Sequence, residues 1–342
     1  MRAIVYTEPG ASSVLSLVDR EVADPGPGEV RVKVAVSGVN PTDWKARSGG
    51  GSRTQFDETV PNQDGAGTID ALGPEVSGLQ VGDRVWMFLA QYERPTGTAQ
   101  EYVNVPASRV APLPDGVGFE IGASLGVPAM TAHRALTVHE YGPARLEPGA
   151  LDGRTVLVAG GAGAVGHAAI QLARWAGATV ITTVSSREKA ALAEAAGAHH
   201  VVDYTDDDAA DQIAKLAPAG VDQIVEVAPA ANIDLDVRVA ANHTSIAYYA
   251  NERGEAASVP VLAAFAKNIR YQGLLVYTVG AEAWAAAAED VTRALADGAL
   301  PVGEEAGLPL TWFDLADTAS AHDAVENGAI GKVLIRVSDS AS

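Results

Sequence analysis

The stretch Thr155-Val-Leu-Val-Ala-Gly-Gly-Ala-Gly-Ala-Val-Gly166 constrains the fold more than any other part of the chain. Its apolar, β-branched beginning, residues 155–158, predicts a buried strand. The strand runs into the pattern Gly161-x-Gly163-x-x-Gly166, after which apolar residues recur at helical spacing. A glycine pattern alone is a weak signal, but a strand, a tight glycine turn and a helix in this order are typical of a dinucleotide site.

Each glycine of this turn has its own expected role. We expect Gly161 to permit the sharp turn, Gly163 to let the backbone approach a pyrophosphate, and Gly166 to let the helix pack closely on the strand. Free N–H groups and the positive end of the helix dipole then face the anion, so Ala164 and Val165 join the predicted cofactor contacts. The alternative is an ordinary glycine-rich turn in a protein rich in Ala and Gly.

The composition sets outer limits on what the chain binds. At 342 residues, two domains are the expectation, and 47% hydrophobic with 20% charged residues fits a folded globular protein. The net charge of −19 argues against nucleic acid or an anionic membrane as a partner, because phosphate binding needs clustered Lys and Arg. The absence of Cys excludes disulfides, a thiolate nucleophile and a zinc site built from Cys.

Neither a targeting segment nor a membrane span is evident. The first residues, Met1-Arg-Ala-Ile-Val-Tyr6, lack the long apolar core and the small-residue cleavage site of a signal peptide. The Ala-rich segment 281–296 contains four charged residues, which excludes it as a span. We therefore expect a cytoplasmic protein.

The first part of the chain is predicted to be rich in β-strands. Strands are expected at 2–6, 31–36, 67–72, 84–88 and 100–105, separated by Pro and Gly pairs, which suggests a small barrel or folded sheet. The segment Asn40-Pro-Thr-Asp43 interrupts them, with Asn40 ending a strand and Pro41 beginning a helix. The loop Ser48-Gly-Gly-Gly-Ser52 is a candidate lid, and the loop 47–59 is expected to shape a pocket.

From about residue 126 the pattern changes to alternating strands and helices. Strands are expected at 179–184, 200–202, 221–227 and 244–248, with a helix at 186–196, which indicates a parallel sheet covered by helices on both faces. The tail adds a strand at 274–278, helices at 281–297 and 316–327, and a final strand at 332–337. That last strand has no obvious partner within the tail, so we expect it to return to the N-terminal domain.

Seven segments, in this order, carry a family resemblance: Val39-Asn-Pro-Thr-Asp43, Asp64-Gly-Ala-Gly-Thr68, Val81-Gly-Asp-Arg-Val85, Gly126-Val-Pro-Ala-Met-Thr131, Val156 to Gly166, Ser185-Ser-Arg-Glu-Lys189 and Gly331-Lys-Val-Leu334. With them, the chain resembles the zinc-independent medium-chain dehydrogenases/reductases of the quinone oxidoreductase, zeta-crystallin-like, family. The resemblance implies an α/β fold, with a Rossmann doubly wound parallel sheet and a GroES-like β-rich catalytic domain. The implied division is a GroES-like domain at 1–127, a Rossmann NADP-binding domain at 128–267, and a return segment at 268–342 that completes both. It also implies a homodimer, with the strand at 274–278 as a candidate edge.

No metal site is expected. The alcohol dehydrogenases of the wider superfamily hold zinc with Cys and His, whereas here the corresponding regions read Val39-Asn40-Pro41 and Gln63-Asp64. A catalytic zinc needs three protein ligands and an open position. The seven His are scattered, and neither His133/His139 nor His199/His200 has Asp or Glu at metal-site spacing, so we interpret them as surface or core residues.

The end of the second predicted cofactor strand decides between NADH and NADPH. Folds that bind NAD carry an Asp or Glu about 20 residues beyond the glycines. Here the strand ends in Ser185-Ser186-Arg187, and Lys189 follows near a helix start, which together form a candidate cradle for a 2′-phosphate. Glu188 is a competing signal, but Ser185-x-x-Glu188 fits a capping box that would turn this Glu toward the helix start. A solvated basic turn is the alternative.

The family resemblance adds the remaining cofactor contacts. Lys189 and Tyr204 lie where the family contacts the 2′-phosphate side of NADPH, so NADPH is the expected cofactor. Further implied contacts are Asn40, Thr131, Ala228, Tyr248 or Tyr249, Gly331 and Lys332. Ala228 and the tyrosine follow strands, at the edge where open α/β sheets bind ligands. Ordinary strand-end packing is the alternative for them, and Lys332 could equally be an exposed strand residue.

The expected chemistry is hydride transfer to an electron-poor acceptor. Without a metal, a quinone or an α,β-unsaturated carbonyl qualifies, and the protein supplies positioning and electrostatics. Asn40 is the first candidate to stabilise charge that develops on the acceptor oxygen, followed by Asp43, Lys45 and Tyr92. Asp43 fits an orienting role better than that of an acid, and Tyr92 is either a donor at the substrate entrance or an exposed loop residue. No Ser-His-Asp motif favours hydrolysis.

Two other functions stay open. One is an enoyl-thioester reductase of the same superfamily, acting on a CoA or carrier-protein substrate, which the acidic balance disfavours. The other is an NADPH-binding sensor or structural protein without turnover, against which Asn40 and the complete cofactor cradle argue.

Overall fold

A computed structural model describes residues 1–50, 56–251 and 256–338. The chain forms two compact units: a terminal unit of Met1–Val127 with Leu310–Ser342, and a central unit of Pro128–Pro309. Both chain ends therefore belong to the same unit. Within the described ranges, no helix combines the length and the apolar character that a membrane crossing requires.

The terminal unit is built on one mixed sheet and a small hairpin. The central strand β3 alternates as predicted, with Val30, Val32 and Val34 buried and Lys33 exposed. The strands of the sheet run in the order β14-β15-β3-β4-β5-β7, while β6 also pairs with β3 and β1 pairs with β2. Their bounds are β1 Arg2–Val5, β2 Ser16–Asp19, β3 Glu29–Val39, β4 Asp64–Leu72, β5 Arg84–Met87, β6 Tyr102–Pro106, β7 Val110–Pro112, β14 Leu310–Asp314 and β15 Lys332–Arg336.

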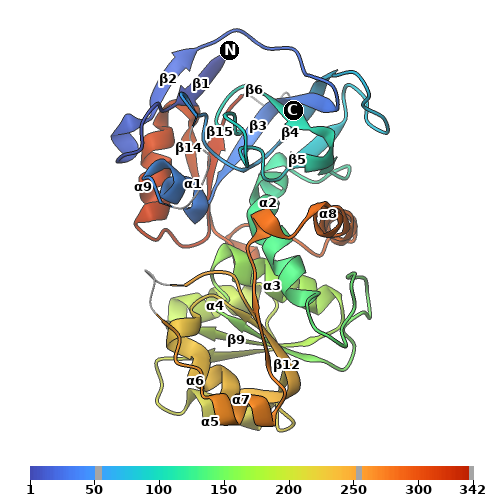
Figure 1. Cartoon of the computed structure of the whole chain (residues 1–342), viewed down its shortest axis with the longest axis vertical. Coiled ribbons are helices and arrows are strands. Elements are labelled where there is room, and N and C mark those ends of the chain that lie inside the picture. The colour runs from blue at the N-terminus through green and yellow to red at the C-terminus, as the bar shows by residue number, and fades with distance from the viewer. Residues whose placement is uncertain (51–55, 252–255, 339–342) are drawn as a thin grey trace. The chain divides into compact units, whose positions relative to one another are not determined.

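The end of the chain returns to the N-terminal sheet, as expected. Strand β15 pairs antiparallel with β3, placing Val333 opposite Val39, and Figure 1 shows β14, β15 and α9 (Thr318–Glu326) beside β3. The expectation that the last strand lacks a partner in the tail was wrong, because β14 pairs with it in parallel. Only five residues long, β14 gives little periodicity to recognise, and the helix α9 connects it to β15.

Helix α1 (Pro41–Arg47) follows β3 directly, so Asn40 ends a strand and Pro41 begins a helix, as predicted. Helix α2 (Phe119–Leu136) continues from the terminal into the central unit. Of the glycine loop proposed as a lid, Gly51 and Ser52 lie outside the described residues.

The central unit is a doubly wound parallel sheet, which confirms the predicted fold class. Six parallel strands run in the order β10-β9-β8-β11-β12-β13, and the order reverses at β8, between β9 and β11. Their bounds are β8 Thr155–Ala159, β9 Thr179–Val184, β10 His200–Asp203, β11 Val221–Glu226, β12 Ala240–Tyr248 and β13 Arg270–Gly273. The helices are α3 Ala164–Trp175, α4 Arg187–Ala195, α5 Ala209–Leu216, α6 Pro229–Val239, α7 Val261–Ala266 and α8 Ala281–Ala296.

The predicted strand at 274–278 is wrong. The sheet ends with β13 at Gly273, and Val276–Thr278 forms a 3₁₀ turn. Leu274, Val276 and Tyr277 are buried by packing, and the Trp284 indole donates to the Val276 carbonyl. A short apolar run is predicted as a strand even where it forms a buried turn. The periodicity of apolar residues cannot distinguish a buried strand from another buried segment of the same length.

Candidate active site

The glycine turn lies at the point where the strand order of the central sheet reverses. Its left-handed residue is Gly160, with φ of 70°, so the sharp turn expected at Gly161 occurs one residue earlier. Gly161 is needed for a different reason: a Cβ there would lie 2.2 Å from the Thr182 Oγ1 of β9. A Cβ at Gly166 would lie 2.3 Å from the Gly160 carbonyl oxygen, so glycine there lets α3 approach β8 as predicted.

The first turn of α3 offers backbone donors to an anion. Gly163 is the N-cap, and a Cβ there would meet only the Gly160 carbonyl oxygen, at 3.5 Å. His167 is the first residue whose N–H reaches a helix carbonyl, that of Gly163 at 2.8 Å. The N–H groups of Ala164, Val165 and Gly166 have no acceptor inside the helix and suit a phosphate.

The residues predicted to recognise a 2′-phosphate converge beyond the ends of β9 and β10. The Lys189 Nζ donates to the Ser185 Oγ at 2.9 Å. Asp203 pairs with Val184 in the sheet, so Tyr204, exposed, follows beside Ser185. Arg187 is exposed and has no hydrogen-bond partner in the described part of the chain.

The predicted capping box was wrong. Ser186, not Ser185, is the N-cap of α4, and its Oγ accepts from the Lys189 N–H at 3.3 Å. Glu188 therefore lies exposed in the first helical turn, one position away from the place that would reach the N-cap N–H. Capping does not remove Glu188 as a competing signal for NAD.

The buried Glu226 holds the backbone at the end of β11 by hydrogen bonds. The Glu226 Oε1 accepts from the Ala228 N–H and from the Asn232 amide, which fixes the start of α6. Tyr248 stands opposite Glu226 at the end of β12 and is partly exposed. Both predicted contacts, Ala228 and Tyr248, thus lie at the carboxyl edge of the sheet. Sequence reasoning missed Glu226, although an acidic residue inside the apolar strand at 221–227 was a signal.

Three other residues predicted from the sequence differ in their exposure. Thr131 is buried in α2, within the central unit. Lys45 is exposed, with its Nζ 5.7 Å from the centre of the Trp44 ring. Tyr92 is partly buried, and the Arg109 guanidinium lies 5.5 Å from the centre of its ring.

The terminal unit gathers Asn40, Asp64 and Lys332 into a buried cluster. The Lys332 Nζ donates to the Asn40 Oδ1 at 2.7 Å and to the Asp64 Oδ2 at 3.4 Å. The Asn40 Nδ2 donates to the same Asp64 oxygen at 2.6 Å. The alternative that Lys332 is an exposed strand residue was wrong, because only 2% of it is exposed.

Charge and backbone contacts define the electrostatics of this Asn40 cluster. Burial lowers the pKa of Lys332, while the nearby carboxylates of Asp64 and Asp43 raise it. Burial likewise raises the pKa of Asp64, and the Lys332 charge opposes that shift. Asp43 accepts the Asn40 N–H at 2.7 Å, the orienting contact that the sequence suggested for it. Asp64 begins one of the segments that carry the family resemblance, but the sequence did not predict it as a site residue.

The described residues contain no group of three His, Asp or Glu side chains that could hold a metal ion. The His133 Nε2 is instead hydrogen-bonded to Asp290 at 2.8 Å, and Arg145 binds the same carboxylate. At the Asn40 cluster, the donor set is an amide, one carboxylate and an ammonium group. Because an ammonium group has no lone pair for a metal, this set does not fit zinc.

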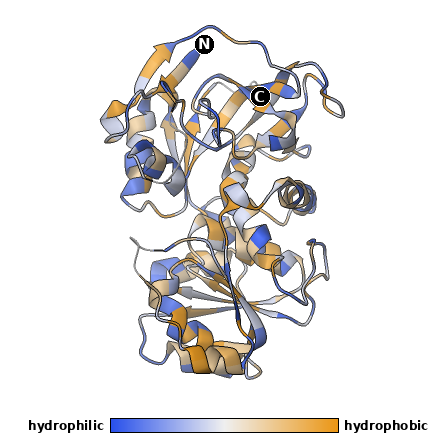
Figure 2. Cartoon of the chain, in the orientation of Figure 1, coloured by the Kyte–Doolittle hydropathy of each residue, from blue (hydrophilic) through white to orange (hydrophobic). Residues whose placement is uncertain are grey.

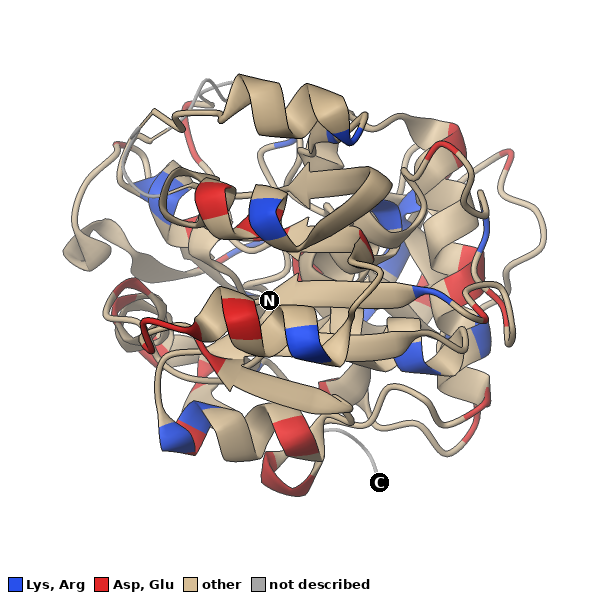
Figure 3. Ribbon diagram, turned by 90° about the horizontal axis from the view of Figure 1, so that it is seen from below, with Lys and Arg blue, Asp and Glu red and all other residues tan. Residues whose placement is uncertain are grey.

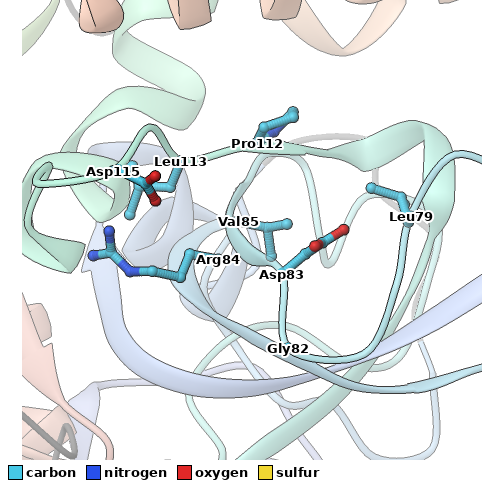
Figure 4. A pocket seen from close by; sticks show the side chains of 8 residues that line it. All are labelled: Leu79, Gly82, Asp83, Arg84, Val85, Pro112, Leu113 and Asp115. Atoms are coloured by element: carbon cyan, nitrogen blue, oxygen red, sulfur yellow. The ribbon is translucent and has the colours of Figure 1, made fainter.

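A shallow hollow of about 330 Å³ in the terminal unit contains none of the predicted residues. Figure 4 shows Arg84 beside Asp115 on one side of this hollow, with Val85 between Arg84 and Asp83. Arg84 donates to the carbonyls of Pro114 and Val117, so its charge is already engaged. We do not assign a ligand to this hollow.

Comparison with known proteins identifies the family. The chain matches the family models for the "Alcohol dehydrogenase GroES-like domain" at residues 26–115 and "Zinc-binding dehydrogenase" at residues 164–293. It is 30% identical to the quinone oxidoreductase of Pongo abelii, over 98% of this chain and 97% of that protein. The chain belongs to the quinone oxidoreductase family. Within it, the terminal unit is the GroES-like domain and the central unit the Rossmann-like domain, as expected.

Solved structures extend this quinone oxidoreductase likeness over the whole chain. A mycobacterial protein complexed with NADPH is 30% identical, with a TM-score of 0.80 and coverage of 98% of this chain and 100% of that one. An NAD-dependent alcohol dehydrogenase has a TM-score of 0.84 at 27% identity, covering 99% and 100%. The shared fold therefore serves both cofactors, and the residues at the end of β9 have to decide between them.

Proposed function

We propose that this quinone oxidoreductase family member uses NADPH to reduce quinones, or other electron-poor enones, without a metal. The observation that carries the proposal is the juxtaposition of Ser185, Lys189 and Tyr204 at one edge of the Rossmann-like sheet. The name of its full-length relative and the NADPH complex of a structural neighbour support it.

Two groups of the central unit are proposed to bind the cofactor phosphates. The free N–H groups at the start of α3 would bind the pyrophosphate, and the cluster at Ser185 would bind the 2′-phosphate. Thr131, Ala228, Tyr248, Asn40 and Gly331 stay proposed contacts. Lys332, which is buried against Asn40, is proposed below to act through Asn40 instead. We also keep the proposed division into a catalytic domain at 1–127, a cofactor domain at 128–267 and a return segment at 268–342.

The proposed role of Asn40 follows from the negative charge that hydride transfer would place on the acceptor oxygen. NADPH, when bound, would supply the hydride, and the acceptor oxygen would then carry negative charge that the protein has to stabilise. We assign Asn40 as the donor to that oxygen, because a preorganised donor in a buried site needs little reorganisation. Asp43 holds the Asn40 backbone, while Lys45 and Tyr92 are proposed to line the way in for the substrate.

Steady-state oxidation of NADPH with a panel of quinones, enones and enoyl thioesters tests the function. We expect turnover with quinones or enones and little with CoA thioesters. Turnover restricted to thioesters would indicate an enoyl-thioester reductase. NADPH binding without any turnover would indicate a sensor or structural protein.

We also propose a homodimer through the β13 side of the central sheet. Strand β13 is the last strand on that side, and the neighbouring helix α7 exposes Leu262 and Phe265. Figure 2 shows the hydrophobic colour gathered on α7, and Leu275 just after β13 is exposed as well. Edge strands with apolar flanks favour pairing. Analytical ultracentrifugation of the double variant Leu262→Glu/Phe265→Glu should show a monomer where the unmodified protein sediments as a dimer.

Nucleic acid and membrane surfaces are not among the proposed partners, and a cytoplasmic location is proposed. In the view of Figure 3, Lys and Arg positions are scattered among Asp and Glu and form no continuous basic stripe. Such a stripe is what phosphate backbones require. Retention on heparin at about 0.1 M salt, where surface charge still acts over roughly 10 Å, would contradict this proposal.

A further inference from the structure

The orientation of the Asn40 amide is determined by its two charged neighbours. The Lys332 ammonium can only donate a hydrogen bond, and the Asp64 carboxylate can only accept one. The amide oxygen must therefore face Lys332, at 2.7 Å, and the amide nitrogen must face Asp64, at 2.6 Å. Because all three side chains are buried, rotation of this amide would break both contacts at once.

One donor of this amide stays available. An Asn side chain carries two N–H bonds on Nδ2, and Asp64 accepts one of them. Among the residues described, the second has no acceptor. A donor held in a fixed direction, buried and unpaired, is suited to an oxygen that arrives with a ligand.

The two charges also change the strength of that donor. An ammonium group at the amide oxygen draws electron density away from the amide nitrogen, and the remaining N–H becomes more acidic. Chains of hydrogen bonds polarise one another in this way, most strongly where water is absent. Lys332 thus strengthens the donor, while Asp64 holds its direction and balances the buried charge.

The surrounding backbone is shaped to hold the cluster. Asp64 also accepts the Val127 N–H of α2 at 2.8 Å. A Cβ at Gly126 would lie 2.0 Å from the Asp64 Oδ1, and one at Gly38 would lie 3.1 Å from the Lys332 Cε. Two glycines on separate elements therefore leave room for these two side chains.

We propose that Lys332 and Asp64 are positioning residues, which orient and polarise Asn40 so that its free N–H binds the acceptor oxygen. The inference rests on the proposed reductase function and gives Lys332 a role other than direct contact with the cofactor. It predicts that loss of the pair slows the chemical step, whereas NADPH binding persists.

The test is a set of variants assayed for kcat, KM for a quinone, and the Kd of NADPH. Lys332→Met/Asp64→Asn removes both charges together, which avoids leaving one buried charge unpaired. We expect kcat to fall by about 10-fold to 100-fold, the scale of losing part of an oxyanion donor, with the NADPH Kd changed less than about twofold. Asn40→Ala should show a similar loss, and the triple variant should lose little more. Lys33→Met, an exposed lysine on β3, is the matched control.

The pH dependence of kcat in Lys332→Arg tests the positioning role, because a purely structural role of Lys332 would not change it. Lys332 faces Asp64 and Asp43, and its lowered pKa predicts that kcat declines on the alkaline side as the ammonium loses its proton. Arg stays charged, so the decline should move to higher pH in this variant. This comparison also serves if the double variant does not fold.

Three results would overturn the inference, each in a distinguishable way. If kcat is unchanged in the double variant but falls in Asn40→Ala, the proposed reductase function would stand, and Lys332 and Asp64 would have no positioning role. A raised NADPH Kd with kcat intact would assign Lys332 to the cofactor. An unmodified protein that binds NADPH but reduces no quinone or enone would end the proposed function and this inference with it.

Discussion

The Lys189 ammonium donates to the Ser185 hydroxyl across 2.9 Å, from the first turn of α4 to the residue that follows β9. This contact holds a positive charge and a hydroxyl at the position where we propose that the 2′-phosphate of NADPH binds. Lys189→Ala should therefore weaken NADPH binding by tenfold or more, ~1.4 kcal/mol, and leave NADH binding unchanged. Titration of both cofactors at the same salt concentration measures this. Lys215→Ala, an exposed lysine on α5, is the control, and equal losses for both cofactors would contradict the cradle.

The start of α4 predicts a difference between two adjacent serines. Ser186 caps the helix through the Lys189 N–H, so Ser186→Ala should lower the free energy of unfolding by about 1 kcal/mol. Ser185→Ala should cost less stability and act on NADPH affinity instead. Urea unfolding of both variants measures the difference. A larger stability loss at Ser185 than at Ser186 would restore the capping box that the structure rejects.

Two buried histidines should make the protein sensitive to acid. Burial lowers the pKa of His322 to about 3 and that of His167 to about 4. His322 donates to the Asn62 amide oxygen at 2.9 Å, and burial together with the nearby Arg47 charge favours its neutral form. Because the unfolded chain takes up these protons near pH 6.5, their stabilising contribution is complete above that pH and declines as the pH falls toward the folded values.

Between pH 7 and pH 5, each of these histidines should cost about 2 kcal/mol of unfolding free energy. Urea unfolding at the two pH values measures the loss. His322→Gln should reduce the pH dependence, whereas His243→Gln, at an exposed position, should not. An identical pH dependence in the His322 variant would contradict the assignment.

A second buried pair predicts the opposite slope. Asp236 lies against Glu226, both are fully buried, and burial together with the Glu226 charge raises the pKa of Asp236 well above its usual value. A carboxyl with a raised pKa in the folded state is most favourable below its unfolded pKa of about 4 and loses stability as the pH rises. Asp236→Asn keeps a neutral donor at that place. We expect a higher melting temperature for this variant at pH 8 than for the unmodified protein, with the gap narrowing toward pH 5. A lower melting temperature at pH 8 would show that the carboxylate is needed.

The local pattern of residue types was enough to predict the secondary structure around part of the candidate site. The glycine turn before α3, the end of β3 at Asn40 and the serines after β9 all depend on neighbours within a few residues, so their secondary structure could be predicted. The positive φ at Gly160 and the cap at Ser186 were each assigned one residue away from where they lie. Such shifts are decided by backbone hydrogen bonds, which the pattern of residue types does not specify.

Tertiary packing decided the structure of segments that the residue pattern left ambiguous. The apolar run after Gly273 reads as a strand, but it is buried by other elements, and β13 ends before it. Glu226 and Asp236 stand ten positions apart in strand and helix, and only the fold buries them together.

The sequence by itself determined a strand, glycine turn and helix in succession, followed by an alternating α/β region, because both arise from short-range periodicity and from the backbone freedom of glycine. Only the tertiary structure decided what Asn40 can do. Its partner Lys332 is 292 positions away, and no local rule pairs an amide with an ammonium group at that separation. The pairing of β15 with β3 brings them together, and burial then turns an unremarkable lysine into a group that orients one amide.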